Sequence, residues 1–123
     1  MAVVYNKSHA DFTTLAHQGD ATVTVDGNLL TGTSGSIYTV AVNNSANSAS
    51  SFLKFYDSKA PTGASDDPIM IIRAWSAGSR YLVMSSKQGV AFSTACSILT
   101  STAGGTGASG SPTSDLEYTI FGS

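Results

Sequence analysis

The chain has 123 residues, which suits one domain with a single hydrophobic core. Its net charge is −2 and its six Lys and Arg residues are scattered, so the pattern excludes a basic stripe for nucleic acid or for an anionic membrane. Cys96 is the single cysteine, which excludes an intrachain disulfide framework and a thiolate zinc site.

The first segment, residues 1–19, has no consistent hydrophobic period and is predicted to be an irregular arm before a domain formed by residues 20–123. Residues 3–5 suit a short strand, and residues 11–17 suit a helical turn with an aspartate N-cap. We expect this arm to dock on another surface, and a leader without fixed structure is the alternative. No signal-peptide pattern is present, and no run approaches the roughly 18 apolar residues that span a bilayer, so synthesis in a cytoplasm is expected.

The first hairpin is predicted around Asp26-Gly27, a dipeptide suited to a tight turn, with strands at residues 21–25 and 28–31. The stretch that organises the chain follows at residues 37–42 and 52–56. Period-two spacing divides the side chains of each segment between two faces, with enough apolar residues on both faces to bury at least one, and a loop of Asn, Ser and Ala joins the segments. They are predicted to pair as a second hairpin.

Residues 69–75 form the most apolar run and predict a central strand buried on both faces. This strand and residues 81–84 are expected to form a third hairpin-like pair, and residues 90–99 are predicted to form one strand with a bulge. Residues 101–115 are rich in Gly, Ser and Thr and predict a mobile surface loop. Residues 116–121 then predict a closing strand with Leu, Tyr and Ile on one face.

About eight short strands with polar connections are therefore expected. This pattern predicts an all-β fold, either an antiparallel β-sandwich or a small barrel, with an irregular N-terminal arm.

No catalytic motif is evident. The candidate metal ligands are His9, Asp11, His17 and Asp20 in one group and Asp57, Asp66 and Asp67 in another. Their spacings fit no known ligand motif, so solvated residues and turn-forming aspartates are the favoured explanations. Cys96 lies in a predicted strand and is expected to be a small buried hydrophobe. We expect no enzyme activity and no cofactor.

Aromatic and basic residues on the predicted strands are candidates for an interface. Trp75 and the tyrosines suit a carbohydrate-stacking face or a protein interface, although core packing is the more frequent use of such residues at strand spacing. The candidate interface residues are Val3, Val4, Tyr5, Phe12, Leu15, Arg73, Trp75 and Arg80.

Four motifs occur in a fixed order along the chain. A predicted strand ends in Asn43-Asn44, the motif LKFYD follows at residues 53–57, GVAFST opens a strand at residues 89–94, and a Gly/Thr-rich loop precedes the closing LEYTIF. This series of motifs resembles a recurrent domain of tailed-bacteriophage structural proteins. The resemblance covers roughly residues 35–121.

The resemblance implies a virion protein of the capsid cement or decoration type, located on the outer capsid surface after synthesis in the host cytoplasm. Its implied partners are the major capsid protein and further copies of itself, with a trimer favoured over a dimer and neither nucleic acid nor membrane involved. A tail or fibre component and a carbohydrate-binding β-sandwich module are the alternatives. A cement role requires interface area and symmetric self-association rather than an active site.

Overall fold

The computed structural model describes residues 3–6, 14–20, 34–83 and 89–122, and every regular element in these ranges is a β-strand. The strands are β1 (Val3–Asn6), β2 (Thr14–Asp20), β3 (Gly35–Asn43), β4 (Ser51–Asp57), β5 (Met70–Ala74), β6 (Ser79–Val83), β7 (Val90–Phe92), β8 (Cys96–Ser101) and β9 (Leu116–Gly122).

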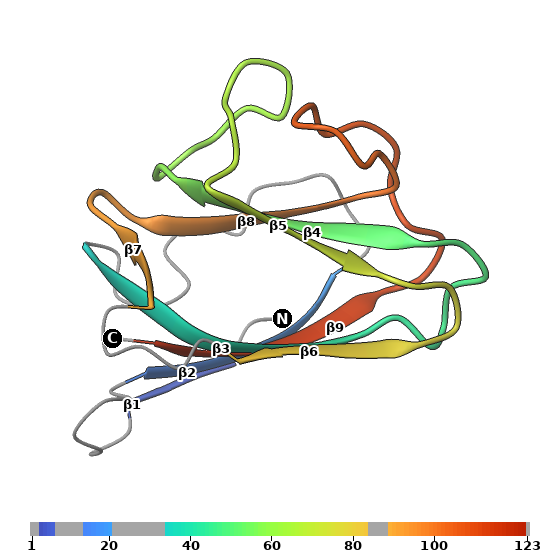
Figure 1. Cartoon of the computed structure of the whole chain (residues 1–123), viewed down its shortest axis with the longest axis horizontal. Helices are drawn as coiled ribbons and strands as arrows, with labels where there is room; N and C mark the ends of the chain where they lie inside the picture. Colours follow the sequence, from blue (N-terminus) through green and yellow to red (C-terminus); the bar gives the residue numbers. More distant parts are fainter. Residues whose placement is uncertain (1–2, 7–13, 21–33, 84–88, 123) are drawn as a thin grey trace.

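The strands form two antiparallel sheets that lie face to face (Figure 1). Sheet A has the order β1-β2-β9-β3-β6, with the short β7 paired to the start of β3, and sheet B has the order β5-β4-β8. The predicted all-β antiparallel sandwich is therefore confirmed, and the described residues contain nine strands where about eight were expected.

The core lies between the two sheets and, within the described residues, takes side chains from β3, β4, β5, β7, β8 and β9. In β9, Leu116, Tyr118 and Ile120 are buried as predicted, whereas Glu117 between them is exposed. The buried apolar cluster consists of Ile37, Val40, Val42, Leu53, Phe55, Ile72, Ala74, Phe92, Cys96, Ile98, Leu116, Tyr118 and Ile120.

A β-bulge in β3 changes the predicted alternation. Ile37 and Val40 are both fully buried although three positions separate them, because the register against β9 shifts between Ile37 and Thr39. Gly89 packs against this bulge with a φ of +55°, and a Cβ atom there would lie 2.3 Å from the Ile37 carbonyl oxygen. Only glycine fits both the conformation and the space.

The predicted hairpins after residue 36 are wrong. β3 and β4 belong to different sheets, as do β5 and β6, so the connections 44–50 and 75–78 cross the sandwich. The single strand predicted for residues 90–99 is divided into β7 in sheet A and β8 in sheet B. Period-two alternation defines a strand but does not define its neighbour, which explains these errors.

β5 is an edge strand rather than the predicted central strand. Its inward residues Ile72 and Ala74 are buried, but Ile71 is 37% exposed on the opposite face. The apolar run thus supplies both a core face and an exposed face.

The described parts of the predicted irregular arm are strands. β2 pairs with β9 along its whole length, from Thr14 opposite Gly122 to Asp20 opposite Leu116, and β1 pairs with β2. Residues 14–17 are therefore extended rather than helical. The pairing is favourable because it satisfies the backbone groups on the edge of β9 that β3 leaves open. The hairpin predicted around Asp26-Gly27 lies outside the described residues.

Two buried asparagines hold the first crossing connection. The Asn44 side-chain amide donates to the carbonyl oxygens of Ala49, Ala74 and Trp75 at 3.0 to 3.2 Å. Asn47 donates to the Asn44 side-chain oxygen and exchanges hydrogen bonds with the backbone of Ser114. The pair thereby joins three separate connections at one end of the sandwich.

Asp57, the last residue of β4, holds the connection 93–95. Its carboxylate accepts hydrogen bonds from the backbone N–H groups of Ser93, Thr94 and Ala95 and from the Ser93 hydroxyl, at 2.6 to 3.3 Å. Desolvation alone would raise the pKa of Asp57, but these hydrogen bonds outweigh it and lower the pKa to about 2.

Lys54 holds the long connection 102–115 over the outer face of sheet B (Figure 1). The side chain is fully buried, and its ammonium donates to the carbonyl oxygens of Gly105 and Gly107 at 2.6 Å each. Burial lowers the pKa of Lys54 from its usual 10.5. The Ala108 N–H also bonds the Gly63 carbonyl oxygen in the neighbouring loop. The prediction of a mobile loop overlooked these contacts, since it considered only the composition of the loop.

Replacing Asp57 with Asn is expected to lower the free energy of unfolding at pH 6 by about 1–3 kcal/mol, because the new amide N–H group faces backbone donors. Folding lowers the pKa of Asp57, so its stabilising effect is present above the ordinary value of 3.8 and is lost as the pH falls through about 2. Urea unfolding of both proteins should therefore show a difference that shrinks toward pH 2. Asp67→Asn, at an exposed position, is the control; an Asp57→Asn difference that stays constant with pH would contradict this assignment.

Replacing Lys54 with Met is expected to release the connection 102–115 locally, because a hydrogen bond to a charged group contributes about 1.5–3 kcal/mol. Hydrogen exchange followed by NMR should show at least a tenfold faster rate, roughly 1.4 kcal/mol, at the Ala108 amide. Lys59→Met, at an exposed lysine, should leave that rate unchanged. Equal exchange rates in the Lys54→Met variant and the wild type would show that the ammonium does not hold the connection.

Candidate interaction surface

Of the candidate metal ligands, Asp57 and Asp66 form hydrogen bonds that hold loops, and His17 and Asp20 lie in a strand. Asp57 holds a turn, and Asp66 accepts a hydrogen bond from the Thr62 N–H at 2.6 Å. His17 and Asp20 lie in β2, whereas His9 and Asp11 lie outside the described residues. Among the residues that the structure describes, no three His, Cys, Asp or Glu side chains are placed to bind a metal ion.

Cys96 is buried in the core, as the sequence indicates. Burial, together with the negative charge of Asp57, raises the pKa of its thiol to about 12. The thiol is therefore protonated at neutral pH, which makes it a poor nucleophile.

An exposed patch lies along the edge strand β5 and its flanks. Ile69 is 40% exposed, Ile71 is 37% exposed and Trp75 is 55% exposed, and Arg73 is also exposed. We call these four residues the β5 patch. The preference for core packing is wrong for Trp75, although it holds for Tyr56 and Tyr118.

The arginine of the β5 patch is held in place by its neighbours. The Arg73 guanidinium lies 3.7 Å from the centre of the Trp75 ring and 5.8 Å from that of Phe52, and it donates to the Ser50 hydroxyl at 3.2 Å. Arg80 of β6 donates to the Arg73 carbonyl oxygen at 3.2 Å, which joins the edges of the two sheets. Three of the predicted interface residues, Arg73, Trp75 and Arg80, therefore lie together.

The other predicted interface residues are not brought to this patch. Val3, Val4 and Tyr5 lie in β1, at the edge of sheet A opposite β6, and Leu15 lies in the adjacent β2. Phe12 lies outside the described residues.

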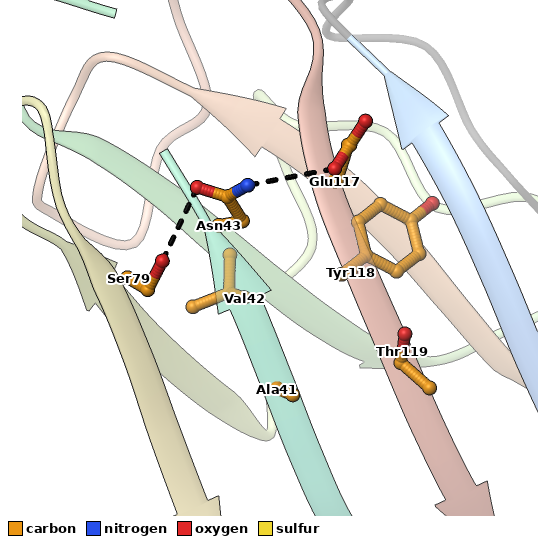
Figure 2. A pocket seen from close by; sticks show the side chains of 7 residues that line it. All are labelled: Ala41, Val42, Asn43, Ser79, Glu117, Tyr118 and Thr119. Carbon is orange, nitrogen blue, oxygen red and sulfur yellow. Dashed lines mark hydrogen bonds between the residues drawn. The ribbon is translucent and has the colours of Figure 1, made fainter. Parts of the chain in front are cut away.

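A shallow polar groove lies near the end of sheet A, and sequence analysis did not predict it. Figure 2 shows the Asn43 amide between the Ser79 hydroxyl, which donates to it at 3.2 Å, and the Glu117 carboxylate, which accepts from it at 3.5 Å. Two adjoining hollows of about 150 and about 300 Å³ share Asn43 and Glu117. The residues around the larger hollow are Asn43, Ser45, Ala46, Ser114, Asp115 and Glu117.

We call these two adjoining hollows the acidic groove, because Asp115 and Glu117 are its charged residues. The sequence signal was the outward position of Glu117 in β9. The neighbour that completes the groove, Asn43, comes from β3 and becomes visible only once the pairing of β3 with β9 is known.

Comparisons of the chain with protein-family models, with curated proteins and with solved structures gave no match. The described residues also contain no helix that is long and apolar enough to cross a membrane.

Replacing Trp75 with Ala is expected to change the free energy of unfolding by less than about 1 kcal/mol, because more than half of the side chain is exposed. Phe55→Ala, at a fully buried position, should cost about 3–5 kcal/mol in the same urea titration followed by circular dichroism. A comparable loss in both variants would mean that Trp75 is a core residue rather than part of a surface.

Proposed function

We propose that this protein is a structural virion protein of the cement type, which binds the outer surface of a tailed-bacteriophage capsid and stabilises the junctions between capsomers. Its partners are the major capsid protein and further copies of the chain, with a trimer favoured over a dimer. The proposal involves no enzymatic step, cofactor, nucleic acid or membrane.

The observation that carries this proposal is the β5 patch. It combines two exposed isoleucines with a stacked pair of Arg73 and Trp75, and Trp and Arg are the residue types that most often dominate binding energy in protein interfaces. The contacts to Ser50 and from Arg80 hold Arg73 in place beneath Trp75 at the end of β5, so little side-chain entropy is lost on binding.

The motif residues behind the phage resemblance support the proposal indirectly. Asn44, Lys54 and Asp57 each hold a connection in place. These motif residues therefore define a scaffold, and the surface available to a partner is supplied by other positions such as Trp75.

The carbohydrate-binding alternative is less well supported at Trp75. A sugar ring stacks on an open aromatic face, but the Arg73 guanidinium already lies 3.7 Å from the centre of the indole ring on one side. A tail or fibre component would use the same patch and differs from the cement role in location.

The proposal predicts that capsids stripped of this chain by mild denaturant will rebind the purified protein and become harder to disrupt by heat. Trp75→Ala should weaken rebinding by at least tenfold, about 1.4 kcal/mol, because it removes the largest exposed side chain of the β5 patch. Co-sedimentation measures the binding, and differential scanning calorimetry measures particle stability.

Lys59→Ala, an exposed substitution outside the β5 patch, is the control and should rebind like the wild type. Stripped particles that melt at the same temperature with and without the chain would rule out the cement role. Specific binding to a glycan array would favour the carbohydrate-binding alternative instead.

A further inference from the structure

We propose that the β5 patch of one copy binds the acidic groove of a second copy, so that the protein assembles head to tail. The inference rests on the proposed function in one respect, because both treat the β5 patch as an interaction surface. It assigns the β5 patch to a second copy of the chain, and it names the acidic groove as the surface of that copy which the patch contacts.

Arg73 of the β5 patch and the neighbouring Arg80 of β6 present two cations. Arg73 bonds the Ser50 hydroxyl and Arg80 bonds a carbonyl oxygen, and within the described residues neither arginine forms an ion pair with a carboxylate. The whole chain carries a net charge of −2, whereas these two neighbouring arginines make the apolar edge locally positive.

The acidic groove presents the complementary charge. Asp115 and Glu117 are both exposed, and the one described partner of the Glu117 carboxylate is the neutral Asn43 amide at 3.5 Å. The larger hollow, about 300 Å³, lies at the low end of the range of about 300–1,000 Å³ for small-molecule pockets. Such a hollow is large enough to receive a side chain from a partner.

The two surfaces are fixed relative to each other before binding. Asn43 belongs to the groove, and the adjacent Asn44 donates to the carbonyl oxygen of Trp75 at 3.0 Å. The Arg80-bearing strand β6 also pairs with β3, which carries Asn43. Both surfaces are therefore preorganised on one rigid corner, which lowers the entropic cost of association.

Charged and apolar side chains would contribute differently to this contact. Exposed ion pairs contribute little affinity, so the arginines and carboxylates would select the partner and its orientation. Trp75, Ile69 and Ile71 would supply the buried apolar contact. Because the patch and the groove are different surfaces, the contact is heterologous, and repetition produces a closed ring or an open chain of copies.

Charge reversal on each surface tests the proposal in purified protein without particles. Sedimentation equilibrium should show that the mass of the wild type rises with concentration, whereas Arg73→Glu and Glu117→Arg should each weaken self-association at least tenfold. An equimolar mixture of the two variants should regain association, since the intact patch of Glu117→Arg can bind the intact groove of Arg73→Glu.

Lys59→Glu makes the same charge change as Arg73→Glu on an exposed loop and should assemble like the wild type, and circular dichroism should confirm that all variants are folded. A wild type that stays monomeric at its highest soluble concentration would overturn the proposal. So would a mixture of the two variants that fails to associate, or a Lys59→Glu variant as weak as Arg73→Glu. A monomer that still binds capsids would overturn this inference while leaving the cement role intact.

Discussion

The structure depends on satisfying the peptide groups of connections that cross between the two sheets. Four of the described connections cross the sandwich, at residues 44–50, 75–78, 93–95 and 102–115, and their backbones lack the ladder partners that strands supply. Polar side chains supply the missing hydrogen bonds. Asn44 and Asn47 hold the connections at one end, Asp57 holds the turn before β8, and Lys54 holds the glycine-rich connection over sheet B. With few charges in the chain, these contacts determine how the loops are arranged.

The same contacts explain the positions of the two surfaces. The Asn44 amide fixes the carbonyl oxygens of Ala74 and Trp75, and this places the indole ring at the sheet edge where Arg73 can stack on it. The neighbouring Asn43 lines the groove beside Glu117. Two consecutive asparagines at the end of β3, Asn43 and Asn44, therefore help to position both the β5 patch and the acidic groove.

Sequence patterns predicted the strands well and their partners poorly. The alternation at Leu116, Tyr118 and Ile120 correctly indicated a half-buried strand, because the signal depends only on residues within the strand. The pairing of β3 with β9 joins segments far apart in the chain, and no local pattern encodes it. Arg73, Trp75 and Arg80 were predicted as interface residues on their type alone. The acidic groove was missed because Asn43 and Glu117 meet only through that long-range pairing.

The position of β9 has a consequence for the order of folding. This strand lies between β2 and β3, so among the described strands the pair β1 and β2 joins the rest of sheet A through β9. During synthesis on a ribosome, sheet A cannot close until Gly122 has emerged, and β3 keeps an unpaired edge until then. Contacts of such long sequence separation slow folding, and until β9 pairs with it the open edge of β3 is available for pairing with other chains.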